Sequence, residues 1–250
     1  MAKGGSSARK GGKRPPHAKA RAQPKARAQP KAQPKPKRTP RPSPAPSPEP
    51  PAPPAERFVL GAIPGATPGK WIDVWKQRMP RTALELLPLA VADQRRAILA
   101  GEVDAAIVRL PLDDTDLHVI ALYDEVPVVV TAAESHLTAV DELSLDDLTG
   151  ETMIVPADDV LGLTVPGTVA PAFPPPADTA DAIATVAAGV GVVIVPMSLA
   201  RLHHRKDADY RPLRDAPTSS VALAWHAERT TPEVEAFIGI VRGRTANSSR

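Results

Sequence analysis

The stretch TADAIATVAAGVGVVIVPMSLARL, residues 179–202, predicts two helices with a buried strand between them. Asp178, or the threonine that follows it, is suited to cap the first helix, in which apolar residues recur at helical spacing, and Gly189 is suited to end it. The β-branched run VVIV at 192–195 is typical of a strand buried on both faces of a parallel sheet. Pro196 ends this strand, and a second helix is predicted directly after it.

The same order of elements occurs earlier in the chain, which predicts two similar α/β lobes. An Ala-Asp pair at 92–93 precedes an Ala-Gly pair by the interval found again at 180–189, and the run AAIV at 105–108 then leads into Arg109. In open parallel sheets, ligands bind beyond the carboxyl ends of the strands, which here are marked by Arg109 and by Pro196. The repeat therefore predicts a ligand-binding cleft between two lobes.

Residues 1–55 differ sharply in composition from the rest of the chain. They hold 14 Lys and Arg against one acid, 15 of the 31 prolines, no aromatic residue and no Leu, Ile or Val. Because such a segment has too little apolar surface to offset the entropy of ordering, a disordered tail is predicted. Subtracting the tail's charge of +13 from the whole-chain +3 leaves −10 for residues 56–250, so an acidic α/β domain follows a basic tail.

The tail is predicted to make only nonspecific contacts. Its Ala-Gln-Pro-Lys repeats favour extended polyproline II segments, and its charge favours salt-dependent attraction to nucleic acid phosphates or to an acidic partner. A solubilising linker or an evolutionary remnant is the alternative. Without aromatic residues to stack on bases or a helix to enter a groove, base-specific recognition is not expected. The residues assigned to the nonspecific contact are Lys25, Arg27, Lys31, Lys35, Lys37 and Arg38.

Several classes of function are not supported by the sequence. The chain has no cysteine, hence no disulfide, thiol nucleophile or thiolate metal site, and no apolar run approaches the length of a membrane span or of a secretory signal. A cytoplasmic protein without a membrane partner is therefore expected. The adjacent His203 and His204 point about 100° apart on a helix and do not converge on a metal. Because GxSxG and HExxH motifs are also absent, we expect no catalytic residue, cofactor or metal.

Two features of the first lobe are candidates for ligand binding. The loop PGATPG at 64–69 joins a predicted strand to a predicted helix, and its glycines let backbone amides approach a ligand, although a plain strand-to-helix turn is the alternative. Arg109 is suited to hold a carboxylate or phosphate in a bidentate contact. A structural ion pair with one of the aspartates at 113–116 is its competing role.

The helix predicted over KWIDVWKQRM, residues 70–79, carries two of the three tryptophans, Trp71 and Trp75, on one stripe. Core packing explains such a stripe, and a subunit interface explains it equally well. We assign both tryptophans to a dimer interface as the hypothesis to test. Further strands are predicted at 58–63, 84–87, 103–108, 127–131, 153–155 and 221–225, and a closing helix at 232–241.

Three motifs taken together resemble the effector-binding, or substrate-binding, domain of LysR-type transcriptional regulators. They are AGEVDAAIVRLP at 100–111, the stretch at 179–202 and YRPL at 210–213, within a resemblance that spans about 57–243. The resemblance implies two Rossmann-like lobes joined by two crossover strands, as in type 2 periplasmic binding proteins, with a small metabolite between them. The implied boundaries are a tail at 1–55 and a domain at 56–245, with lobe I at about 57–130 and 220–245 and lobe II at about 131–219.

The resemblance also implies ligand contacts in both lobes. Gly65 and Val91 stand where many members carry a hydroxyl residue, so Thr67 and Arg109 remain for a carboxylate. The winged helix-turn-helix of the family has no counterpart in residues 1–55, and no sequence-specific DNA-binding domain is expected. The ligand-binding residues implied are Gly65, Ala66, Thr67, Val91, Arg109, Leu110, Pro156, Pro196 and Met197.

The predicted function is a homodimeric, non-enzymatic sensor of a small metabolite with a role in transcription. A solute-binding protein of the same fold is one alternative, although the chain has neither a signal peptide nor a cysteine for lipid attachment. A degenerate interaction protein that binds no ligand is another. An enzyme on this fold is disfavoured, because hydroxymethylbilane synthase needs a cysteine and prephenate dehydratase a Thr-Arg-Phe motif, and the chain has neither.

Overall fold

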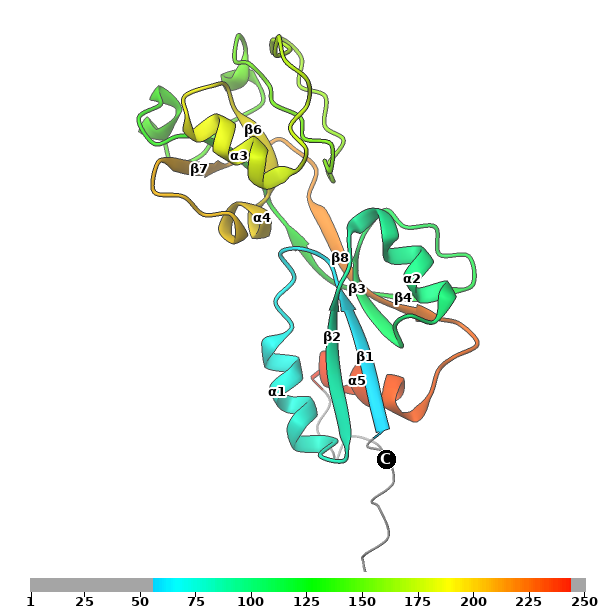
Figure 1. The fold of residues 1–250 in the computed structure, drawn as a ribbon. Helices are drawn as coiled ribbons and strands as arrows, with labels where there is room; N and C mark the ends of the chain where they lie inside the picture. The colour runs from blue at the N-terminus through cyan, green and yellow to red at the C-terminus, as the bar shows by residue number, and fades with distance from the viewer. Residues whose placement is uncertain (1–55, 244–250) are drawn as a thin grey trace, which may run out of the picture. The chain divides into compact units, whose positions relative to one another are not determined.

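A computed structural model describes residues 56–243, which form two α/β lobes around two separate sheets (Figure 1). Residues 1–55, which include the cations assigned to nucleic acid, and residues 244–250 lie outside the described residues. Within 56–243, no helix is both long enough and apolar enough to cross a membrane. The strands of lobe I are, in spatial order, β2 (Thr82–Pro88), β1 (Glu56–Ala62), β3 (Ala105–Arg109), β8 (Ser219–His226) and β4 (Leu117–Glu125).

The sheet of lobe I is mixed and has helices on both faces. Strand β1 runs parallel to β2 and β3, whereas β8 is antiparallel to β3 and β4. Alternate side chains of β1 point to opposite faces, as strand geometry requires. Phe58 packs towards α1 (Gly69–Arg78) and α5 (Pro232–Val241), and Val59 packs towards α2 (Gln94–Ala100), which follows the short helix η1 (Val91–Asp93).

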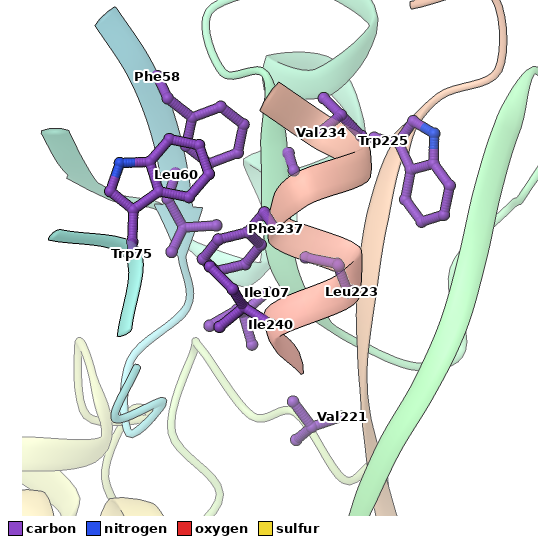
Figure 2. Close-up of a cluster of buried hydrophobic side chains, with 11 residues drawn as sticks. Phe58, Leu60, Trp75, Ile107, Val221, Leu223, Trp225, Val234, Phe237 and Ile240 are labelled. Atoms are coloured by element: carbon purple, nitrogen blue, oxygen red, sulfur yellow. The ribbon is translucent and has the colours of Figure 1, made fainter. Parts of the chain in front are cut away.

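The aromatic core of lobe I contains Trp75, which the sequence assigned to a dimer interface. Its ring stacks on Phe58 with centroids 4.6 Å apart, and Phe237 of α5 lies 5.4 Å from Phe58 (Figure 2). The indole Nε1 donates a hydrogen bond to the Thr82 carbonyl at 3.0 Å, and no part of Trp75 is exposed. A side chain enclosed in its own lobe offers no surface to a partner, so this part of the interface prediction is corrected. Trp71 is half-buried against the same core.

Lobe II is built on a smaller sheet in which β5 (Pro127–Ala132) lies between β6 (Val193–Pro196) and β7 (Ala208–Pro212). The predicted strand at 192–195 is present and buried on both faces, but it pairs antiparallel with β5 and not in a parallel sheet. The reason is that β6 lies beside β5. Strand β5 enters lobe II directly after β4 of lobe I, and it runs in the direction opposite to β6. A strand was predicted at 153–155. In its place the structure has a single parallel bridge, between Met153 and Val192.

The internal repeat predicted from the sequence is confirmed. Asp178 caps α3 (Thr179–Ala187) by accepting a hydrogen bond from the Asp181 backbone N–H at 2.8 Å. Gly189 then adopts a left-handed φ of 88°, and Gly101 does the same after α2 with φ of 73°. In both lobes, therefore, a helix ends at a left-handed glycine and leads into a buried strand.

The chain crosses between the lobes twice. It leaves lobe I at Val126, between β4 and β5, and it returns through residues 213–218, between β7 and β8. The first crossing lies four residues before the predicted boundary at 130, because every residue of β5 pairs within the sheet of lobe II. Lobe II is completed by α4 (Met197–Leu202) and by two short helices, η2 (His136–Ala139) and η3 (Asp146–Leu148).

Candidate ligand-binding site

A cavity of about 550 Å³ is lined by residues of both lobes. Lobe I contributes the loop residues 65–67 and the end of β4 with the residue that follows it, 123–126. Lobe II contributes Met197, Ser198, Arg201 and Leu202, all from α4. The volume falls within the range of pockets that hold small molecules, so this cavity is the candidate ligand site.

The loop after β1 lies directly against α4. Gly65 has a φ of 84°, in the left-handed region that favours glycine, and the Ala66 backbone N–H donates to the Ile63 carbonyl at 3.2 Å. A Cβ atom built on Gly65 would lie 2.9 Å from the Cβ of Ser198 and would overlap the Ser198 hydroxyl. A glycine is therefore needed here both for the backbone conformation and for the close approach of lobe II.

Four side chains, which we call the interlobe network, join the lobes beside the cavity. Arg109 Nη1 forms an ion pair with Glu125 Oε2 at 3.0 Å and donates to Ser219 Oγ at 2.6 Å. The Ser198 hydroxyl donates to the same Glu125 oxygen at 2.9 Å. Since Arg109, Glu125 and Ser219 come from three strands of lobe I and Ser198 comes from α4, Glu125 is a direct polar link between the lobes.

Arg109 is almost completely buried, with 2% of its surface exposed. The Gln94 side chain accepts a hydrogen bond from the Arg109 backbone N–H at 2.9 Å and donates to its carbonyl at 2.8 Å. Of the two roles that the sequence left open, the structure shows an ion pair, but its partner is Glu125 and not an aspartate at 113–116. The positive charge of Arg109, which is suited to bind a ligand, is already compensated by Glu125. Arg109 also does not line the cavity.

Burial and two neighbouring charges shift the pKa of Tyr123, which lies in the cavity wall. Partial burial raises the pKa of its phenol above the ordinary value, the Glu125 carboxylate raises this pKa further, and the Arg109 guanidinium lowers it. The phenol is therefore protonated at neutral pH and can donate a hydrogen bond to a ligand. Among residues 56–243, the Tyr123 hydroxyl has no hydrogen-bond partner and thus remains available.

The structure brings together some of the predicted ligand residues and separates others. Gly65, Ala66, Thr67 and Met197 all line the cavity and are therefore neighbours in space. Four other predicted residues lie outside the cavity wall. Val91 is half-buried in η1, and Leu110 lines a separate, more open hollow. Pro156 lines a small pocket within lobe II, and Pro196 is buried at the end of β6 opposite Pro127. Within the described residues, no cluster of three His, Asp or Glu is arranged to hold a metal ion.

Seven residues of the cavity wall were not predicted. Four of them, at 123–126, follow from β4, a strand that sequence reasoning missed. Ser198, Arg201 and Leu202 lie on α4, whose start was expected. Because residues four apart share a helix face, Arg201 could have been predicted from the assignment of Met197 to the site.

Comparisons with known proteins place the fold in a family. A model of the LysR substrate binding domain matches residues 51–246. The Hca operon transcriptional activator HcaR of Escherichia coli K12 is 24% identical over 206 residues, which cover 76% of this chain and 69% of HcaR. The HTH-type transcriptional regulator CatR of Pseudomonas putida is 29% identical over 168 residues, which cover 63% of this chain and 57% of CatR, less than two thirds of that relative.

Solved structures show the same fold. The BenM effector binding domain, solved with its effector benzoate, superimposes with a TM-score of 0.63 at 20% identity, covering 75% of this chain and 91% of that one. The reduced OxyR regulatory domain of Pseudomonas aeruginosa superimposes with a TM-score of 0.59 at 24% identity, covering 75% and 95%. The two-lobed architecture expected from the sequence is thus confirmed, and the chain belongs to the LysR substrate-binding domain family.

Proposed function

We propose that this chain is a non-enzymatic sensor of a small metabolite that takes part in regulating transcription. The observation that carries the proposal is the cavity lined by both lobes next to the interlobe network. A ligand that contacts both the loop at 65–67 and α4 binds more tightly when the two segments surround it. It therefore stabilises that arrangement of the lobes. The names of HcaR and CatR, both transcriptional regulators, support the regulatory part of the proposal.

A thermal-shift screen of small carboxylates, amino acids and aromatic acids tests the proposal. A ligand at a hundredfold excess over its Kd is expected to stabilise the folded protein by about 2.7 kcal/mol, which raises Tm by several degrees. Val126→Trp should remove this shift, because the larger side chain occupies the cavity. Val140→Trp changes a similarly exposed valine outside the cavity and should retain the shift.

The outcomes separate the alternatives. A ligand that stabilises both tryptophan variants equally binds elsewhere and contradicts the proposed site. If no compound stabilises the wild type, the non-binding interaction protein becomes the better description. Turnover of a stabilising compound would instead indicate an enzyme.

We further propose that the protein acts as a homodimer in the cytoplasm and that its basic tail adds nonspecific contacts with nucleic acid or an acidic partner. The support for the tail contact is the charge of +13 in residues 1–55. In a mobility-shift titration with unrelated DNA sequences, the full chain is expected to bind all of them weakly, with affinity that falls as salt rises. Deleting residues 1–55 should abolish this binding, and binding that survives the deletion or prefers one sequence contradicts the assignment.

A further inference from the structure

Exposed apolar side chains gather around the cavity. Tyr123, Val126 and Leu202 are 40%, 41% and 54% exposed, and all three line it. Single exposed hydrophobic residues are common on proteins, but three of them around one hollow form a patch that favours an apolar ligand surface. Because Tyr123 and Val126 come from lobe I and Leu202 from lobe II, an apolar body placed here contacts both lobes.

The charged side chains of the cavity differ in how they are engaged. Glu125 is bound by Arg109 and Ser198, and Asp124 accepts a hydrogen bond from the Ser220 hydroxyl at 2.6 Å. Arg201 is the one basic side chain in the cavity wall, and it makes no ion pair or side-chain hydrogen bond with any residue in 56–243. The cavity therefore presents a free cation on its lobe II wall and acids on its lobe I wall.

We propose that the cavity binds an amphiphilic anion whose apolar body lies against Tyr123, Val126 and Leu202 and whose acidic group is held by Arg201. This inference rests on the proposed function, because it names the ligand class of the same site. It moves the anion-binding role from Arg109, which is buried and paired, to an exposed arginine on α4 that has no partner in the described part of the chain. Aryl and alkyl carboxylates and sulfonates share the required chemistry, since each joins an apolar body to an anion that a guanidinium binds.

The position of Arg201 favours this role. It follows Met197, another residue of the cavity wall, by four positions, and the two therefore lie on one face of α4. A cation in the last turn of a helix also interacts favourably with the terminal carbonyls. That competing role predicts a change in stability when Arg201 is replaced, whereas anion binding predicts a change in ligand discrimination.

Two dyes that share one ring system test the inference. 8-Anilinonaphthalene-1-sulfonate carries a sulfonate, N-phenyl-1-naphthylamine does not, and both fluoresce more strongly in apolar surroundings. In fluorescence titrations of the full chain, both are expected to bind, the sulfonate more tightly. Arg201→Gln should weaken binding of the sulfonate about fivefold to tenfold, the effect of losing one partly exposed charge-assisted contact, and leave the neutral dye unchanged.

Matched variants make the result specific. Arg201→Glu should weaken the sulfonate further and spare the neutral dye. Arg205→Gln removes a nearby exposed arginine that is paired with Asp207 outside the cavity, and it should change neither dye. Val126→Trp should reduce binding of both dyes because it fills the space used by the shared rings.

Each contrary outcome has a definite meaning. If Arg201→Gln leaves the sulfonate's affinity unchanged, or if the neutral dye binds as tightly as the sulfonate, the inference is wrong while an apolar ligand site remains supported. Binding of neither dye also overturns the inference. In that case, metabolite stabilisation that Val126→Trp removes would still support the proposed function, so the two failures are distinguishable.

Discussion

Replacing Glu125 with alanine is expected to lower the free energy of unfolding by about 3–5 kcal/mol. The change leaves the Arg109 guanidinium, which is 2% exposed, without its counter-charge at 3.0 Å. It also removes the acceptor of the Ser198 hydroxyl and with it a direct side-chain link between the lobes. Urea denaturation of the wild type and the variant measures the loss.

Two further variants show whether this loss comes from an uncompensated buried charge. Arg109→Met combined with Glu125→Leu replaces both ions with apolar groups of similar size and should recover most of the stability. Glu85→Ala breaks the exposed ion pair with Arg57 and should cost about 1 kcal/mol or less, because water already solvates both groups. A Glu125→Ala loss as small as that of Glu85→Ala would show that Arg109 reaches solvent when its partner is removed.

Gly65→Ala is expected to lower the free energy of unfolding by about 2–3 kcal/mol. The left-handed φ of 84° disfavours any residue with a Cβ by about 1–2 kcal/mol. The new methyl group also overlaps Ser198, so either the loop or α4 must shift. Thermal and urea denaturation of the single variant measure the combined effect.

Two controls separate the backbone strain from the contact between the lobes. Gly69→Ala adds a methyl group where no atom lies within 4 Å, at the first residue of α1, and it should stabilise the protein slightly. Gly65→Ala combined with Ser198→Gly removes the overlapping side chain but keeps the strained backbone, so it should recover part of the loss. Equal stability of the Gly65→Ala and Gly69→Ala proteins would contradict both the backbone strain at Gly65 and its overlap with Ser198.

The regular elements could be predicted well because their signals are local. The helix predicted at 232–241 coincides with α5, and the cap at Asp178 and the left-handed turn at Gly189 are where the sequence indicates them. Strand β4 was missed because a bulge between Ala121 and Tyr123 interrupts its alternation of buried and exposed residues. That omission hid the end of the strand, which supplies three residues of the cavity wall, and Val126, which follows it and supplies a fourth.

The candidate site could be predicted only where a feature is contained in one short segment. The loop at 65–67 is recognisable from its glycine and from its place between a strand and a helix. The pairing of Arg109 with Glu125 is not, because several acids follow Arg109 in the sequence and the nearest ones do not reach it. Ser198 meets Glu125 across 73 residues, and no local pattern marks such a contact.

The sequence by itself determined the two-lobed α/β architecture, through hydrophobic periodicity, caps and glycine turns that act within about ten residues. It also placed Arg109 at the end of a buried strand and made the loop after β1, which lines the cavity, a candidate for ligand binding. Only the tertiary structure decided how the charges are used: Arg109 is neutralised by Glu125, whereas Arg201 has no partner among residues 56–243 and lies beside three exposed apolar side chains. The physical reason is that electrostatic pairing depends on distance in space and on burial, and both are set by how the strands cross between the lobes.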